Sequence, residues 1–199
     1  MKTRILDRLV LVVAGIFVLS GMGMAAEFTA DMIQTGQKML YKGKLYVKGG
    51  KLRQEISVGV KQIVIERPDK KLVWTCDPSD KTYMVVTNAI IRGIDDPRAR
   101  ARLKEIGKAK PPTKETINGY LCTKRVWIGK GAPAKSLTEW RSDKLGMNVK
   151  ILIKETSATR VIEYKNIKLG KVPDSVFEVP KGYHLVPTPS APAQSAQPQ

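Results

Sequence analysis

Residues 39–60 alternate apolar and polar side chains with a period of two on both sides of Gly49-Gly50. This alternation is typical of β-strands with one buried face, and two glycines between such strands favour a two-residue hairpin loop. In the register that this loop implies, Val47 lies opposite Leu52. A shift of one residue would move every apolar side chain to the polar face, so the pattern predicts both the hairpin and its register.

Further short strands are expected along the rest of the chain, separated by hydrophilic turns. Pro68-Asp69 suits the centre of a type I turn, and Asn118-Gly119 suits a second hairpin. About ten strands are expected in all, among them residues 61–66, 72–76, 82–87, 120–128 and 148–155. An array of this size with one apolar face must stack as two sheets or curl into a barrel. The expected fold class is therefore mainly β.

One short helix is expected, beginning at Asp95 or Asp96 and ending near Gly107. Pro97 falls in its first turn, and apolar residues follow at helical spacing. Its basic side chains are Arg98, Arg100, Arg102 and Lys104. They form either a solvated face or a contact for anionic lipid headgroups or a partner. Near an anionic surface each basic residue contributes about 1 kcal/mol.

Residues 1–26 have the pattern of a cleavable signal peptide, with basic residues before a short apolar run at 9–19 and small residues after it. The run is shorter than the roughly 20 residues that cross a bilayer. Met22 stands where lipoprotein processing needs a cysteine, so we expect an exported protein without a lipid anchor, located in the periplasm. The expected domain is residues 27–186, followed by a disordered Pro/Ala/Ser/Gln tail at 187–199.

The formal net charge of +17 would suit a nucleic-acid-binding protein. Export argues against that partner, because the abundant anions outside the cytoplasm are lipid phosphates and acidic polymers. Charge bears on association rather than on fold. We therefore expect an anionic membrane surface or an envelope protein as a partner, and no nucleic acid.

The chain has two cysteines, Cys76 and Cys122. In an oxidising compartment an even pair favours a disulfide, which would add about 4 kcal/mol by the loop-entropy model. A metal site is the alternative, but it would need more nearby ligands, and His184 is the only histidine. We expect the disulfide and no metal.

Four stretches carry a resemblance to a known family: "LYVKGGKLRQEI", "VWTCDPSDKTYMVV", "INGYLCTKRVW" and "VPDSVFEVPKGYHLV". In this order they resemble the LolA-like superfamily of periplasmic lipoprotein carriers, and most closely its poorly characterised lipoprotein-sorting relatives. The resemblance covers roughly residues 28–186. It implies a curved antiparallel half-barrel sheet whose concave face is covered by helices and loops and holds acyl chains or other lipids. The chain departs from LolA itself at residues 27–36, which look like a strand where LolA begins with a long helix.

The half-barrel predicts a set of apolar residues on the concave face, where they line a lipid-binding cavity or form an ordinary core. The set is Tyr41, Leu45, Val47, Leu52, Ile56, Val58, Trp74, Met147, Val149 and Ile151. Apolar cavities of this kind bind apolar ligands. We expect a periplasmic carrier or chaperone for a lipid or for the acyl chains of a lipoprotein. The alternative is an envelope protein-interaction or stress-sensing module on the same fold.

An enzyme is not expected. His184 has no evident nucleophile as a partner, and the chain lacks a G-x-S-x-G motif, an H-E-x-x-H motif and a phosphate-binding glycine loop. No cofactor is expected either.

Overall fold

The computed structural model describes residues 26–36, 39–87, 107–129 and 136–187. Its strands are β1 (Phe28–Gly36), β2 (Met39–Lys48), β3 (Lys51–Val58), β4 (Val60–Arg67), β5 (Leu72–Asp77), β6 (Thr82–Thr87), β7 (Gly107–Ala109), β8 (Thr113–Ile117), β9 (Tyr120–Gly129), β10 (Ser136–Ser142), β11 (Met147–Lys154), β12 (Thr159–Leu169) and β13 (His184–Leu185). Two short 3-10 helices are η2 (Pro68–Lys70) and η3 (Asp174–Phe177).

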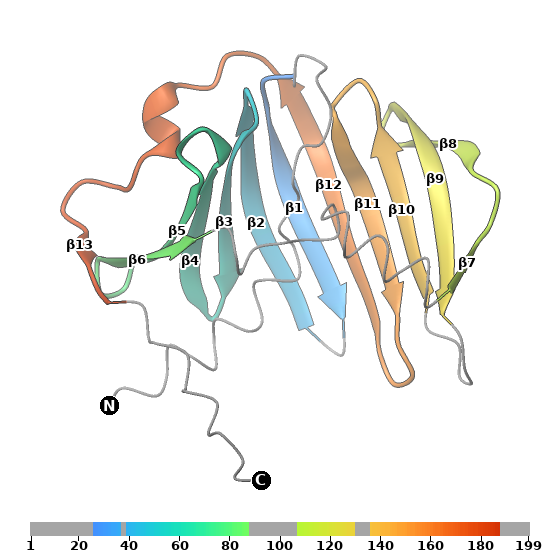
Figure 1. Ribbon diagram of the computed structural model, residues 1–199, viewed down its shortest axis with the longest axis horizontal. Coiled ribbons are helices and arrows are strands. Elements are labelled where there is room, and N and C mark those ends of the chain that lie inside the picture. Colours follow the sequence, from blue (N-terminus) through green and yellow to red (C-terminus); the bar gives the residue numbers. More distant parts are fainter. Residues whose placement is uncertain (1–25, 37–38, 88–106, 130–135, 188–199) are drawn as a thin grey trace, which may run out of the picture.

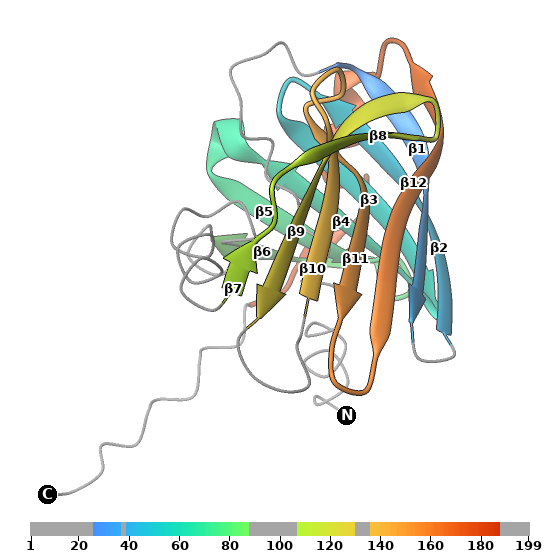
Figure 2. The same cartoon turned by 90° about the vertical axis from the view of Figure 1, so that its right-hand side faces the viewer.

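The strands form one sheet in the order β13-β6-β5-β4-β3-β2-β1-β12-β11-β10-β9-β7, and β8 also pairs with β9. Every pairing is antiparallel except that of β13 with β6. The sheet bends into a trough, with β1, β2 and β12 at its floor and the outer strands rising as two walls (Figures 1 and 2). The expected mainly β, curved half-barrel is confirmed. Thirteen strands replace the expected ten or so, because β7 and β13 are too short to show a period in the sequence.

The structure tests few of the expected helical features. The helix expected between Asp95 and Gly107 lies outside the described residues, apart from Gly107, which begins β7. Arg98, Arg100, Arg102 and Lys104 lie outside them as well. Within the described ranges, no helix is long and apolar enough to cross a membrane.

The first hairpin has the predicted register. Val47 pairs with Leu52, and Lys44 pairs with Glu55. Gly49 and Gly50 both adopt positive φ, as a two-residue loop of this kind requires. The same pairing continues across the floor, where Phe28 lies opposite Val47. Residues in phase with Val47 therefore share one face of the sheet, which we name the inner face because it lines the trough.

Bulges and a close approach accompany the bend of the sheet. The register shifts between Thr29 and Asp31 where β1 meets β12, and between Trp140 and Arg141 where β10 meets β11. Such bulges increase local twist and bending. At Gly43 a Cβ atom would lie 2.4 Å from the carbonyl oxygen of Glu55, so only glycine allows β2 and β3 to pack this closely.

The strand β8, which forms a hairpin with β9, crosses the outside of the wall that β9, β10 and β11 form. Figure 2 shows β8 crossing in front of neighbouring strands. At its tip the Asn118 side-chain amide donates to the carbonyl oxygen of Tyr164, at 2.8 Å, and so reaches β12. Trp140 Nε1 on β10 donates to Glu115 on β8, at 2.9 Å. The predicted Asn118-Gly119 turn is confirmed, with positive φ at both residues.

The predicted disulfide is wrong. Cys76 and Cys122 are both free thiols. Cys76 lies on β5 in one wall and Cys122 on β9 in the other, with β4, β3, β2, β1, β12, β11 and β10 between them. Each thiol is buried in its own apolar cluster. The even count suggested a bond, but the sheet order separates the two residues.

Candidate ligand-binding face

The inner face is the candidate site, because it brings most of the predicted ligand-binding residues together. They are Tyr41, Leu45, Val47, Leu52, Ile56, Met147, Val149 and Ile151. All belong to one buried cluster that also contains Phe28 and Ile162 from the floor of the trough. Their side chains are at most 7% exposed. The face is therefore continuous and apolar from β3 to β11.

Two predicted residues remain. Val58 lies at the end of β3 and pairs with Val60. Trp74 was predicted on the concave face, and this is wrong. In β5 it pairs with Ile65, which is out of phase with the inner face, and it packs in the second core cluster. The phase of β5 that contains Trp74 also contains Leu72 and Cys76 and is the more apolar one, so the sequence alone favours it as the inward phase.

The second cluster lies on the outer face of β4 and β5, where residues 172–185, here named the closing segment, cover it. Phe177 and Val172 of the closing segment pack on Ile63, Ile65 and Cys76. Figure 1 shows η3 outside the wall formed by these strands. Cation–π contacts place Lys70 5.1 Å and Arg67 5.9 Å from the ring centroid of Trp74.

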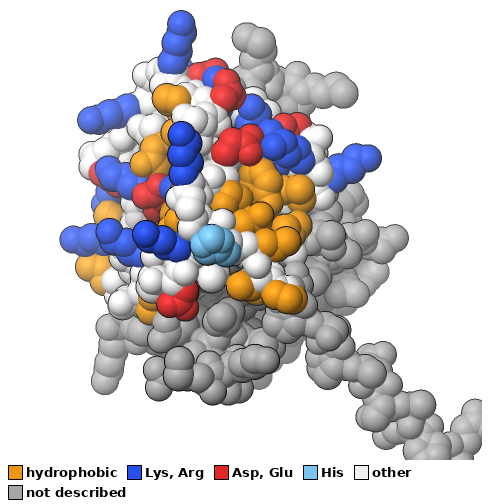
Figure 3. All heavy atoms as spheres, turned by 90° about the vertical axis from the view of Figure 1, so that its left-hand side faces the viewer, with side chains coloured by type: hydrophobic (Ala, Val, Ile, Leu, Met, Phe, Trp, Pro, Cys, Tyr) orange, Lys and Arg blue, Asp and Glu red, His pale blue; other side chains and the backbone are white. Residues whose placement is uncertain are grey.

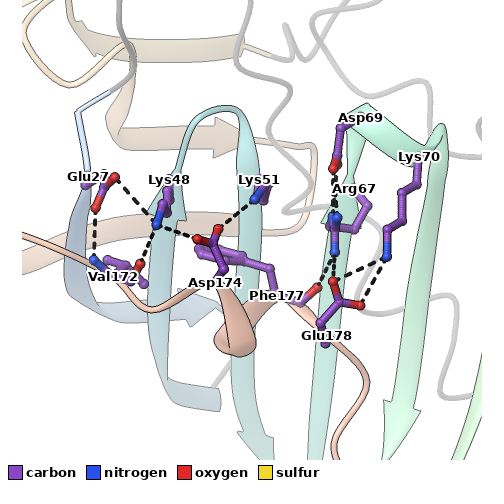
Figure 4. A network of polar contacts seen from close by, with 10 residues as sticks. All are labelled: Glu27, Lys48, Lys51, Arg67, Asp69, Lys70, Val172, Asp174, Phe177 and Glu178. Carbon is purple, nitrogen blue, oxygen red and sulfur yellow. Dashed lines mark hydrogen bonds and ion pairs between the residues drawn. The ribbon is translucent and has the colours of Figure 1, made fainter.

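Ion pairs hold the closing segment to the sheet (Figure 4). Asp174 accepts from Lys51 at 2.8 Å and from Lys48 at 2.9 Å. These two ammonium groups hold the pKa of the Asp174 carboxyl down at about 2. Val172 N donates to Glu27 at 3.0 Å, which ties the start of the closing segment to the residue before β1.

Arg67, at the end of β4, is the most buried charged side chain of this network. It is 6% exposed, donates to the carbonyl oxygen of Phe177 at 3.1 Å, and also pairs with Asp69 and Glu178. The "P-D-S-x-F" part of the closing motif therefore packs on the outer face of β4 and β5, here named the outer wall, and not on the inner face. Figure 3 shows that wall from outside, with basic side chains around a patch of apolar ones.

The inner face also contains three buried polar side chains that sequence reasoning missed. Gln54 on β3 donates through Nε2 to the Tyr164 hydroxyl on β12, at 3.2 Å. This hydrogen bond crosses over β2 and β1 and so spans the floor of the trough. Burial raises the pKa of the Tyr164 hydroxyl far above its ordinary value, and the tyrosine stays neutral.

Glu66 is the third. It occupies an inner-face position on β4, paired with Leu52 on one side and Val73 on the other. The side chain is 5% exposed, and among the described residues no group donates a hydrogen bond to its Oε1 atom. Burial raises the pKa of the Glu66 carboxyl to about 8, so the acid is mostly neutral at pH 7. An unpaired buried polar group costs about 1–3 kcal/mol.

The sequence alone does not predict that Glu66 faces inward, because this depends on which phase of β4 lines the trough. Gln62, Val64 and Glu66 share one phase of β4 while Ile63 and Ile65 share the other, and the sequence alone favours the isoleucines as the inward phase. The structure places the isoleucines outward, under the closing segment. In the described part of the chain, no group of three or more His, Cys, Asp or Glu could hold a metal ion.

Comparison with known proteins shows the class of fold. No family model and no curated protein matches the sequence. A chain in the structure of the Pseudomonas aeruginosa MucA/MucB complex superposes with a TM-score of 0.54 at 9% identity, over 78% of this chain and 56% of that chain. This chain thus spans little more than half of that one. An uncharacterised conserved protein from Thermus thermophilus has a TM-score of 0.54 at 11% identity, over 83% of this chain and 92% of its own.

The fold read from the sequence agrees with these neighbours. A LolA superfamily protein from Nitrosomonas europaea is also matched, at 12% identity over 86% of this chain and 96% of its own. Its TM-score of 0.39 is too low for further argument. At these identities the likeness concerns the fold alone, and not the ligand or the partner.

Proposed function

We propose that this protein is a non-enzymatic periplasmic carrier or chaperone that binds the acyl chains of a lipid or lipoprotein on its inner face. The observation that supports this proposal is the mainly apolar inner face that extends across an open, bent sheet. An open sheet can change its curvature more easily than a closed barrel, because its two edge walls are not hydrogen-bonded to each other. Acyl chains match such a face because contact removes apolar surface from water on both sides.

The inner-face side chains are already buried, so a bound acyl chain exchanges with protein contacts rather than with water. We expect the trough to widen on loading. The first test is a lipid extract and a native mass spectrum of the exported protein, purified without detergent. Bound acyl lipid is the expected result, and a ligand-free protein that also takes up no lipid from vesicles would contradict the proposal.

Ile56 and Ser57 give a matched pair for locating the site. Ile56 lies on the inner face and Ser57, its neighbour in β3, is exposed on the other. We expect Ile56→Asp to abolish lipid loading, because a carboxylate against an acyl chain costs several kcal/mol of desolvation. We expect Ser57→Asp to load normally. Ile56→Thr, which keeps the branch at Cβ but is smaller and carries a hydroxyl, is the variant to measure if Ile56→Asp fails to fold, and its loading should be reduced.

The second candidate function is a protein-interaction module in the envelope. One observation favours it: the fold is shared with a chain in the MucA/MucB complex, which is an assembly of two proteins. Photo-crosslinking at Leu185, which is 60% exposed on the outer wall, would test it. A specific envelope protein, captured by a ligand-free chain and lost when Arg98, Arg100, Arg102 and Lys104 are neutralised, would support this candidate over the carrier.

A further inference from the structure

Glu66 is the one carboxyl group buried among apolar neighbours on the inner face of the described structure. Leu52 and Val73 flank it in the sheet. Gln54 and Tyr164, two other buried polar side chains of the inner face, bond to each other. Among the described residues, no charged side chain contributes to the raised pKa of the Glu66 carboxyl, and burial is its cause.

A buried carboxyl with an unpaired oxygen is costly, and a core position between leucine and valine would ordinarily be apolar. The group lies on the face that the proposed function assigns to a ligand. We therefore propose, on the basis of that function, that Glu66 is the polar anchor for the ligand and donates a hydrogen bond to the ester or amide carbonyl oxygen of a bound acyl chain.

The chemistry of the site selects this kind of ligand group. A neutral carboxylic acid is a hydrogen-bond donor, and the carbonyl of an acyl ester or amide is a neutral acceptor at the head of an apolar chain. A phosphate or a free carboxylate would place a charge among Leu52, Val73 and the other apolar side chains, at a large desolvation cost. An ammonium group would require Glu66 to ionise. Glu66 thus favours the linkage region of a diacyl lipid or lipoprotein over its charged headgroup.

The anchor should make binding depend on pH in one direction. Below pH 8 Glu66 is protonated and donates, and above pH 8 it ionises and loses the donor. Of the residues that face it, Gln54 does not titrate and Tyr164 stays neutral throughout this range. Leu52 and Val73 carry no charge. A fall in affinity as the pH rises through 8 is therefore attributable to Glu66.

The test uses the full exported chain and phosphatidylcholine with a pyrene-labelled acyl chain, because the charge of this lipid does not change between pH 6 and pH 9.5. Wild-type affinity should fall about tenfold between pH 7 and pH 9. Glu66→Gln keeps a donor of the same shape, so its affinity should stay flat over this range. Glu66→Leu should be flat and several-fold weaker than wild type at pH 7. Glu155→Gln, at an exposed position, is the matched control and should follow wild type.

Each outcome separates the anchor from the carrier function. If wild type binds with a flat pH profile and Glu66→Leu binds equally well, the anchor is wrong and the carrier function stands. Affinity that increases with pH in wild type, but not in Glu66→Gln, would overturn the anchor in favour of a cationic ligand. If wild type binds no labelled lipid at any pH, the carrier function itself fails. Circular dichroism at each pH shows that the variants are folded.

Discussion

Glu66 and Arg67 are neighbours in β4 whose side chains point to opposite faces, and their different surroundings give them opposite chemistry. Glu66 is buried without a charged partner, and its carboxyl has a raised pKa of about 8. Arg67 is equally buried but has Asp69, Glu178 and the Phe177 carbonyl as partners. Two consecutive residues of one strand thus carry a neutral acid on the inner face and a paired cation on the outer wall.

Glu66 should make the stability of the ligand-free protein fall with rising pH. Its folded pKa lies above its unfolded value of about 4.5, so its contribution is complete below pH 4.5 and is lost as the pH rises to about 8. In that window the loss approaches about 1.4 kcal/mol per pH unit. Urea unfolding at pH 5, 6.5 and 8 should therefore show Glu66→Gln gaining stability relative to wild type as the pH rises. A stability difference that does not change with pH would contradict the burial of this carboxyl.

At the scale of elements, the closing segment acts as a clamp on the outer wall. It has almost no regular structure of its own, with only η3 and the two residues of β13. It is placed by Phe177 in the outer cluster and by ion pairs to β2, β3 and β4. Because the clamp covers the outward phase of β4 and β5, it decides which phase of those strands faces the trough.

Arg67 is the residue on which the clamp depends most. Arg67→Met should lower the free energy of unfolding by about 2–4 kcal/mol, because the Phe177 carbonyl and the Asp69 carboxylate lose the guanidinium and Glu178 keeps only Lys70. Arg67→Lys should retain only part of the stabilisation that Arg67 provides, since an ammonium group cannot make the same forked contacts. Lys70→Met, at an exposed position that also pairs with Glu178, should change stability by less than about 1 kcal/mol. Urea denaturation would measure all three, and equal effects for Arg67→Met and Lys70→Met would contradict the clamp.

At the scale of the whole molecule, the sheet order separates the two walls, and the sheet is not closed into a barrel by hydrogen bonds between them. The same order separates the two cysteines, and each thiol is buried in a different apolar cluster. Burial raises the pKa of the Cys76 thiol to about 11, which keeps it protonated and poorly reactive. The protein is therefore stabilised without a covalent link between its walls.

The cysteines offer a direct check of this arrangement. We expect the exported protein to have the intact mass of two free thiols and to react with a thiol reagent only slowly while folded. In denaturant, without reductant, two thiols per chain should react rapidly. A mass that lacks two hydrogens, or an absence of reactive thiols in denaturant, would show that the walls are linked and that the sheet order described here is wrong.

The period-two patterns predicted the strands and the first hairpin because they are local: Gly49-Gly50 and the flanking alternation suffice to place Val47 opposite Leu52. Where the more apolar phase of a strand is covered by another segment, as in β5, the pattern does not reveal which phase faces the trough. Trp74 was therefore placed on the wrong face and Glu66 was overlooked. The disulfide prediction failed for a related reason, since a count of cysteines carries no information on strand order.

By itself, the sequence determined that this chain forms amphipathic antiparallel strands with an apolar face broad enough to need covering, because hairpin register and alternation depend on neighbouring residues. Tertiary structure decided which face each wall strand turns inward, where the closing segment docks, and that Gln54, Glu66 and Tyr164 share the trough. These features depend on contacts between residues far apart in the chain, such as Arg67 with Phe177 and Gln54 with Tyr164, and such pairings become visible only when the sheet has bent.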